Sequence, residues 1–144
     1  MNQVTPGPWT ETLREFIRHP VGMIGTDSTF VGAKPSPRTY GSFPRVLGQF
    51  VREEALLSVE EAVRSMTSAA AERLGLRDRG QVQDGLVADL VVFDPERIRS
   101  NATYDEPRRF PDGIEWVLVG GDVVVEPGVG HTGARGGRVL RRRR

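Results

Sequence analysis

The 144-residue sequence contains no cysteine, which excludes disulfides, thiolate metal ligands and a cysteine nucleophile within it. Only two histidines are present, His19 and His131, and neither stands in an H-x-H or H-E-x-x-H pattern. The chain therefore has no evident set of three or four ligands for a zinc site. No apolar run approaches the length of a membrane span, and the first residues show no signal-peptide pattern. These absences favour a cytoplasmic chain without a membrane partner.

A strong charge of either sign is also missing. The 20 basic and 19 acidic residues give a formal net charge of +1, so no whole-chain field attracts nucleic acid or a lipid surface. Lys34 is the only lysine, and the other basic residues are arginines. The terminal run of four arginines lacks interleaved aromatic residues, which predicts a solvated tail and no nucleic-acid partner.

Helical spacing of apolar residues is present in three parts of the first half. Residues 10–18 and 46–54 each show one apolar face, and residues 58–74 add a capping box at their start and Gly75 directly after their end. Each pattern predicts a helix. Residues 29–45 contain several prolines and glycines with aromatic residues between them, which predicts an ordered loop rather than regular structure.

Strand patterns are found once in the first half and dominate the second half. The apolar run 21–25 predicts a buried strand, and 86–93 is a β-branched run closed by Asp-Pro. Residues 114–119 and 123–125 flank two consecutive glycines, which predicts a β-hairpin.

Asp27 is the candidate catalytic residue. It follows the predicted strand 21–25 among glycine and small hydroxyl residues, and a carboxylate at a strand end is where α/β barrel enzymes place reactive groups. There it could accept a proton from a metal-bound water and return it to a leaving group. The alternative is an ordinary turn or N-cap aspartate.

Two arginines stand close to Asp27 in the sequence. Arg38 lies in the aromatic loop after it, and Arg52 lies on the predicted helix that follows. A guanidinium beside a catalytic acid suits recognition of a substrate carboxylate through two parallel hydrogen bonds. The alternative for both residues is an ordinary surface arginine.

Four stretches of the sequence together resemble one enzyme family. They are IGTDS (24–28), PSPRTYGSFPRVLGQFVREE (35–54), LSVEEAVRSMTSAAAERLGLRDRGQVQDGLVADLVVFDP (57–95) and GIEWVLVGGDVVVEPGVGHTGARGGRVLR (113–141). The pattern within 79–95 is common to amidohydrolases generally. The four stretches together resemble the C-terminal part of the N-acyl-D-amino-acid deacylases, or D-aminoacylases, of the amidohydrolase superfamily. The block PRTYGSFPRVLGQFVREE (37–54) and the closing HTGARGGRVLR (131–141) are specific to this branch.

The resemblance implies an α+β fragment. Residues 1–78 would form the end of a metal-dependent (β/α)8 barrel, namely its last strand, a substrate loop and helices. Residues 79–144 would form the β-rich segment of a small accessory β-sandwich, with an Arg-rich tail.

The same resemblance implies roles for single residues. Asp27 would follow the eighth barrel strand, lie beside the zinc site and act as the general acid/base. Arg38 would bind the carboxylate of an N-acyl-D-amino acid, with Arg52 assisting. Asp89 would be structural.

Whole members of that family carry a complete barrel with His-x-His and further ligands, and those motifs are not in this sequence. We therefore expect zinc in the parent enzyme, no tight zinc binding by this chain alone, and no activity of the isolated chain. Its expected partners are an N-acyl-D-amino acid and the missing N-terminal barrel, with self-association through the unpaired strand at 21–25. The alternatives are a fragment of a dihydropyrimidinase-like cyclic-amide hydrolase, or a separate polypeptide that serves as a non-catalytic binding or structural module.

Overall fold

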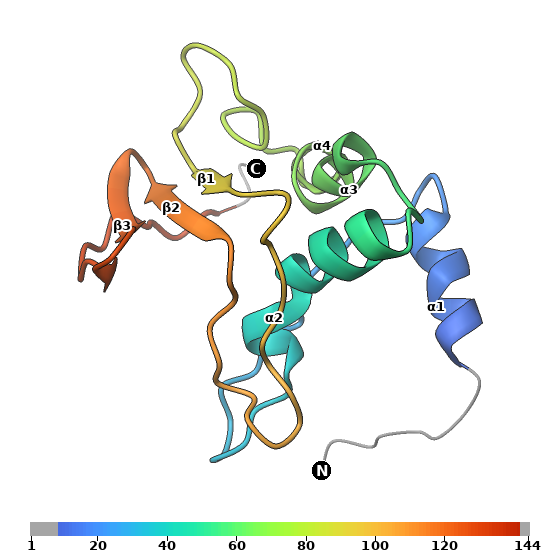
Figure 1. Ribbon diagram of the computed structural model, residues 1–144. Coiled ribbons are helices and arrows are strands. Elements are labelled where there is room, and N and C mark those ends of the chain that lie inside the picture. The colour runs from blue at the N-terminus through green and yellow to red at the C-terminus, as the bar shows by residue number, and fades with distance from the viewer. Residues whose placement is uncertain (1–8, 142–144) are drawn as a thin grey trace.

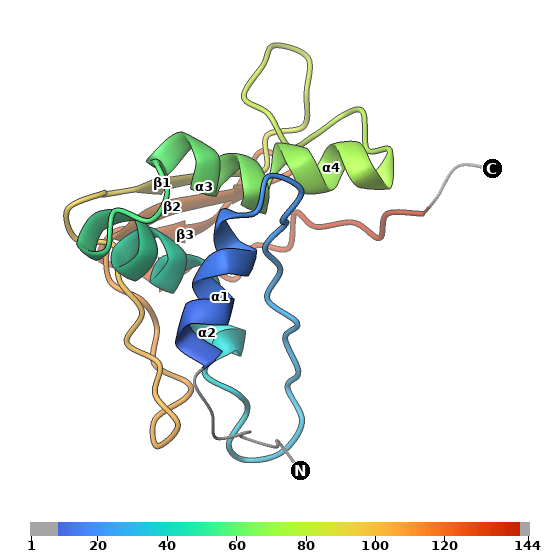
Figure 2. The same ribbon diagram turned by 90° about the vertical axis from the view of Figure 1, so that its right-hand side faces the viewer.

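The computed structural model describes residues 9–141. The fold is α+β, with helices in the first half of the chain and an antiparallel sheet in the second. In Figure 1 the strands lie on the left and the helices on the right, and Figure 2, viewed from the helical side, shows the strands behind the helices. The elements in order are α1 (Trp9–Arg18), α2 (Arg38–Arg45), the π-helix η1 (Val46–Glu53), α3 (Val59–Met66), α4 (Ser68–Leu74), β1 (Leu90–Phe93), β2 (Ile114–Val119), β3 (Asp122–Glu126) and β4 (Gly130–His131).

Helix α1 confirms the first predicted helix and starts one residue earlier than expected. An ion pair fixes it to Glu54, the residue directly after η1, because Arg14 Nε donates to Glu54 Oε2 at 2.8 Å. The same guanidinium also reaches Glu11 Oε1, one helical turn away, at 2.9 Å. Helix α1 is thus held to residues that lie forty positions later in the chain.

The predicted strand at 21–25 is wrong. This segment has no regular secondary structure, and the side chains of Val21 and Met23 are 77% and 47% exposed. Only Ile24 packs against the core, and its N–H donates to Ser65 O at 3.1 Å. A strand requires a neighbouring strand to accept its backbone hydrogen bonds, and the part of the chain that the structure describes places none beside this segment.

The predicted loop 29–45 is irregular only up to Pro37, because α2 occupies residues 38–45. Pro37 directly precedes the helix with φ −52° and ψ −29°, so its ring presets the helical direction. Pro44 has no backbone N–H and so removes one hydrogen bond inside α2. The wider π-helix η1 begins two residues later, at Val46. The predicted helix 46–54 is therefore confirmed as helical, with π rather than α geometry.

The hydrophobic core forms where η1 meets α3 and the segment after β1. Its buried members are Val46, Leu47, Phe50, Ala62 and Ile98. Three of these come from η1, and Ile98 is only 1% exposed although it lies about fifty residues later in the sequence. The helical half and the strand-rich half therefore share one core.

The predicted helix 58–74 forms two helices. Its capping box is confirmed: Ser58 Oγ accepts from Glu61 N at 3.1 Å, and Glu61 Oε2 accepts from Ser58 N at 2.8 Å. The break lies at Thr67, which has φ −130° and ψ −88°. The Thr67 hydroxyl donates to Val63 O at 2.7 Å, a local bond of the kind that competes with helical backbone bonding. Gly75, in the left-handed region at φ 70°, ends α4 as predicted.

The sheet has the order β1-β2-β3-β4 with antiparallel neighbours. The predicted hairpin is confirmed: β2 and β3 meet across Gly120 and Gly121, whose φ angles of 62° and 91° match the turns that favour glycine. Strand β1 is shorter than the predicted 86–93, and β4 was not predicted. No helix within 9–141 is long and apolar enough to cross a membrane.

Asp89 lies directly before β1 and joins separate parts of the sheet region. Its Oδ1 accepts from Gly120 N at 2.8 Å in the hairpin, and its Oδ2 forms an ion pair with Arg79. These contacts agree with the structural role expected for this residue. The assignment of 1–78 to a barrel and 79–144 to an accessory sandwich stays a prediction.

Candidate active site

Asp27 and Arg38, two of the three predicted site residues, lie together. Arg38 Nη2 is 2.8 Å from Asp27 Oδ2, and Arg38 Nε donates to the Asp27 backbone oxygen at 3.1 Å. The Asp27 side chain is 82% exposed, and its φ of 44° falls in the left-handed region. A non-glycine residue in this region stores backbone strain, which is common at functional sites.

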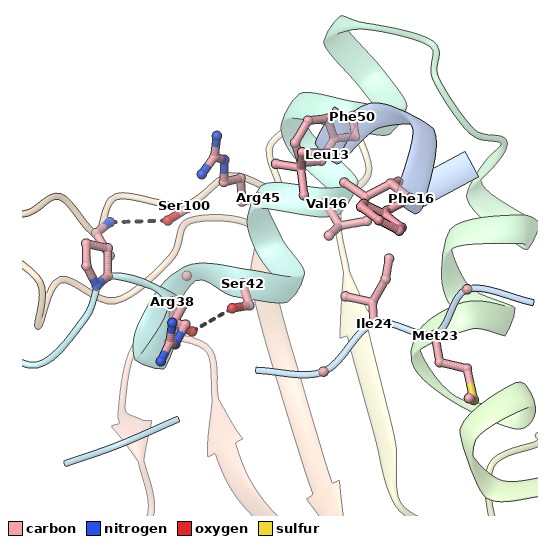
Figure 3. A pocket seen from close by; sticks show the side chains of 16 residues that line it. Leu13, Phe16, Met23, Ile24, Arg38, Ser42, Arg45, Val46, Phe50 and Ser100 are labelled. Carbon is pink, nitrogen blue, oxygen red and sulfur yellow. Dashed lines mark hydrogen bonds between the residues drawn. The ribbon is translucent and has the colours of Figure 1, made fainter. Parts of the chain in front are cut away.

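The local sequence explains where Arg38 lies. It is the first residue of α2, directly after Pro37, so the helix start fixes its backbone. One turn later, Ser42 Oγ donates to Arg38 O at 2.7 Å. Figure 3 shows this bond, with Arg38 and Ser42 on the same stretch of helix. The Arg38 backbone is thus fixed at the start of the helix, and its guanidinium is directed back toward Asp27.

The loop between Asp27 and Arg38 is held by the second half of the chain. Phe30 packs edge-on against Tyr40, with ring centroids 6.3 Å apart, and Tyr40 packs edge-on against Phe110 at 5.7 Å. Arg108 donates to the backbone oxygens of Gly32 and Ala33 at 3.3 and 3.5 Å. In Figure 1 the loop after β1 lies beside the loop before α2. This confirms an ordered loop with aromatic anchors at residues 29–37.

A groove of about 350 Å³ lies beside Arg38, between α1, α2, η1 and residues 100–102. Figure 3 shows its apolar side chains on one side and its polar groups along α2 and Ser100. The apolar lining includes Leu13, Phe16, Ile24, Val46 and Phe50, and the polar lining includes Arg38, Ser42, Arg45 and Ser100. A pocket with an apolar wall and a few convergent polar groups suits a small ligand that carries both an anion and an apolar part.

Arg45 is a groove residue that the sequence reasoning missed. Arg38, Ser42 and Arg45 follow the i, i+4, i+7 spacing of one helix face, but this signal was lost because 29–45 was predicted to be a loop. Arg45 is engaged in the structure: its Nε donates to Gln49 Oε1 at 2.8 Å, and its guanidinium lies 5.5 Å from the centroid of the Phe50 ring. Arg38 is the groove arginine that faces a carboxylate.

Arg52 is not brought to this pair. Its Nη1 donates to the backbone oxygens of Pro95 and Ile98 at 3.0 and 2.7 Å, and its Nη2 lies 3.5 Å from Glu53 Oε1. The groove beside Arg38 does not include it. A contact between Arg52 and substrate stays a prediction.

The described residues do not fit a metal site. Within 9–141 no group of three or more histidine, cysteine, aspartate or glutamate side chains could hold an ion. Each histidine instead accepts a local backbone N–H at Nδ1: His19 from Val21 at 3.4 Å, and His131 from Gly133 at 3.0 Å. The expectation that this chain alone does not bind zinc tightly stays a prediction.

The carboxylates with shifted pKa values lie outside the groove. Hydrogen bonds from Arg14 and then from Gln49 lower the pKa of Glu54. A hydrogen bond from Arg79 lowers the pKa of Asp78. A hydrogen bond from Arg99, and to a smaller extent one from Asn101, lowers the pKa of Asp112. Two of these ion pairs, Arg14–Glu54 and Arg99–Asp112, join separate segments of the chain, and the lowered pKa values make stability depend on pH.

Comparison with known proteins adds the decisive observation: the sequence profile of the amidohydrolase family matches residues 3–125. The chain belongs to the amidohydrolase family. N-acyl-D-glutamate deacylase of Alcaligenes xylosoxydans xylosoxydans is 44% identical over 130 residues, which are 90% of this chain and 26% of that protein. The chain therefore spans about a quarter of the length of this relative.

Solved structures of family members superpose closely on the chain. A crystal structure of D-aminoacylase matches with a TM-score of 0.88 and 42% identity, covering 92% of this chain and 28% of that one. N-acyl-D-glutamate deacylase from Bordetella bronchiseptica matches with a TM-score of 0.78 and 42% identity, covering 84% of this chain and 26% of that one. That second structure holds zinc and a phosphonate inhibitor that mimics the tetrahedral intermediate.

Proposed function

We propose that this chain forms the C-terminal portion of a zinc-dependent N-acyl-D-amino-acid deacylase, and that the isolated chain is inactive. The observation that carries the proposal is the Asp27–Arg38 pair, in which a candidate proton carrier and a candidate carboxylate receptor touch at the edge of a groove. The names of the relatives support the substrate class. The activity belongs to the whole protein, since this chain covers only 26% of the matched deacylase.

In this proposal Asp27 moves protons and Arg38 orients the substrate. Attack of water on the acyl carbonyl forms a C–O bond, and Asp27 accepts the proton that the water loses. The C–N bond then breaks as Asp27 gives that proton to the departing amine nitrogen. The products are a carboxylate and a free D-amino acid.

Arg38 would hold the α-carboxylate of the substrate through two parallel hydrogen bonds. Its Nη2 and Nε are now directed at the carboxylate and backbone oxygens of Asp27. A bound substrate carboxylate would take over part of this contact and free the Asp27 side chain for proton transfer. Selection for an anion beside the reacting amide follows from this arrangement.

The zinc of the proposal needs ligands from another part of the whole protein, because residues 9–141 contain no set that could hold it. None of the steps assigned to Asp27 and Arg38 passes through the metal. The remaining barrel is accordingly a proposed partner of this chain, whether it belongs to the same polypeptide or to another.

The substrate assignment can be tested by grafting residues 1–144 into the Alcaligenes deacylase in place of its matching segment. Turnover of an N-acyl-D-amino acid is compared with turnover of its α-amide, which lacks the negative charge. We expect the graft to prefer the acid, and Arg38→Gln to reduce that preference by roughly tenfold or more, because a charge-assisted pair is lost.

Arg73→Gln, at an exposed arginine of α4, is the matched control and should keep the preference. An unchanged preference in Arg38→Gln contradicts the assignment. Faster turnover of cyclic imides than of N-acyl-D-amino acids would instead favour the dihydropyrimidinase-like alternative.

The claim that this chain is a portion of a longer enzyme has its own test. An antibody raised against residues 38–54 isolates the native polypeptide, and mass spectrometry gives its intact mass. We expect a mass several times the 15.9 kDa of this chain. A mass equal to 15.9 kDa would favour the non-catalytic module.

A further inference from the structure

The helix that carries Arg38 lies unusually close to the segment that follows β1. A Cβ added at Gly41 would collide with the Ser100 side chain and come within 3.3 Å of Ala102 Cβ. A Cβ added at Gly48 would lie 2.6 Å from the backbone oxygen of Ile98. Both glycines therefore face the same segment, and we call them the glycine face of the α2–η1 helix. Only glycine permits such a close approach of helix and backbone.

Arg52 bonds to this same segment at the far end of the helix. Its Nη1 donates to the oxygens of Pro95 and Ile98, at 3.0 and 2.7 Å. The side chain is 26% exposed, so most of it is shielded from water. One guanidinium thus satisfies two carbonyl groups next to the glycine face, and hydrogen bonds from a charged donor are stronger than those between neutral groups.

Arg38 and Arg52 are the two ends of one continuous helical stretch, because η1 begins at Val46 directly after α2 ends at Arg45. The first end faces Asp27, and the second end is fixed to the carbonyls after β1. Between the two ends, the glycine face leaves no room for the helix to shift toward the segment. The helix that carries Arg38 is therefore held near its far end by Arg52.

We infer that Arg52 is a positioning residue, which orients Arg38 by fixing the shared helix to residues 95–98, and that it does not itself contact the substrate. The inference rests on the proposed function for the role of Arg38. It differs from the assisting substrate contact that the sequence resemblance implies. The strand-rich half of the chain then contributes to the site, because it supplies the carbonyl groups of Pro95 and Ile98 that hold Arg52.

The first test uses the 144-residue chain and needs no activity. Proton–nitrogen correlation spectra report the Arg38 Nε–H, which donates to Asp27 O, and hydrogen exchange reports the amides of α2 and η1. In Arg52→Gln we expect the Arg38 signal to move and exchange in 42–50 to speed up by roughly tenfold or more. Amides of β2 and β3 should keep their protection.

Arg52→Lys is the second variant. It keeps the charge and at least one hydrogen-bond donor, so we expect it to fold even if Arg52→Gln does not. It should give the same changes at smaller size. Arg73→Lys on α4 is the matched control and should change nothing. If the Arg38 signal and the exchange rates stay at their wild-type values in both Arg52 variants, the inference is wrong.

The second test is a double-mutant cycle in the deacylase graft. If Arg52 acts through Arg38, Arg52→Gln lowers kcat/KM in the wild-type graft but adds little to the loss caused by Arg38→Gln. If Arg52 contacts the substrate, the two losses multiply, and the inference is overturned. An inactive graft would count against the proposed function alone, because the spectra decide the positioning role independently.

Discussion

Ile98→Ala should destabilise the whole chain, because Ile98 joins the strand-rich half to the helical core. The side chain is 1% exposed and packs with Val46, Leu47 and Phe50 of η1. The substitution removes three carbon groups, which contribute about 2.4 kcal/mol at about 0.8 kcal/mol each. The unfilled cavity adds about 1–2 kcal/mol, so we expect a total loss of about 3.4–4.4 kcal/mol.

Urea unfolding followed by far-ultraviolet circular dichroism and by tryptophan fluorescence measures this loss. Both signals should shift together, and the melting temperature should fall by about 10 °C. Ile98→Val should lose about 1 kcal/mol. Val82→Ala is the control, because Val82 is 88% exposed, and it should stay within about 0.5 kcal/mol of wild type. A loss below about 1 kcal/mol for Ile98→Ala, or two separate transitions, would refute a core shared by both halves.

Ser58→Ala removes the oxygen that accepts the Glu61 N–H, so the free energy of unfolding in urea should fall by about 1 kcal/mol, and Ser58→Asp should restore it. An unchanged free energy of unfolding in Ser58→Ala would count against the capping box. Acid should destabilise the chain, because Arg14 lowers the pKa of Glu54 from its ordinary value of 4.5. This contribution to stability is complete above pH 4.5 and is lost as the pH falls through the lower pKa of the folded state. Urea midpoints measured at a series of pH values should fall accordingly, and an equally steep fall in Glu54→Gln would contradict this role of Glu54. The exposed apolar side chains of Phe16 and Val21 predict self-association in sedimentation velocity, whereas a monomer at every concentration would exclude it.

The helices and turns whose signals lie within a few neighbouring residues could be predicted from the sequence. Helix α1, the capping box at Ser58 and the hairpin at Gly120 each follow from signals within a few residues. Helix α2 could not, because Gly41 and Pro44 both count as breakers in a local reading. Gly41 is explained only by Ser100, whose closeness to it depends on the tertiary fold.

The same distinction applies to the site. The sequence placed Asp27 and Arg38 eleven residues apart, and their ion pair forms across one loop. It predicted a strand before Asp27 because an apolar run satisfies the local pattern, but strand pairing depends on residues elsewhere. The partners of Arg52 lie 43 and 46 residues away, so no local pattern could show that its guanidinium binds backbone carbonyls.

The most direct test of the proposed chemistry is the turnover number of the deacylase graft with Asp27→Asn. Asparagine keeps the size of the side chain and cannot carry the proton, so kcat should fall by roughly 10²–10⁴-fold while circular dichroism and KM change little. The control is Asp84→Asn, at an exposed aspartate in the loop before β1, which should keep full turnover. A kcat within a few-fold of wild type in Asp27→Asn would contradict the role of Asp27 and, with it, the proposed function.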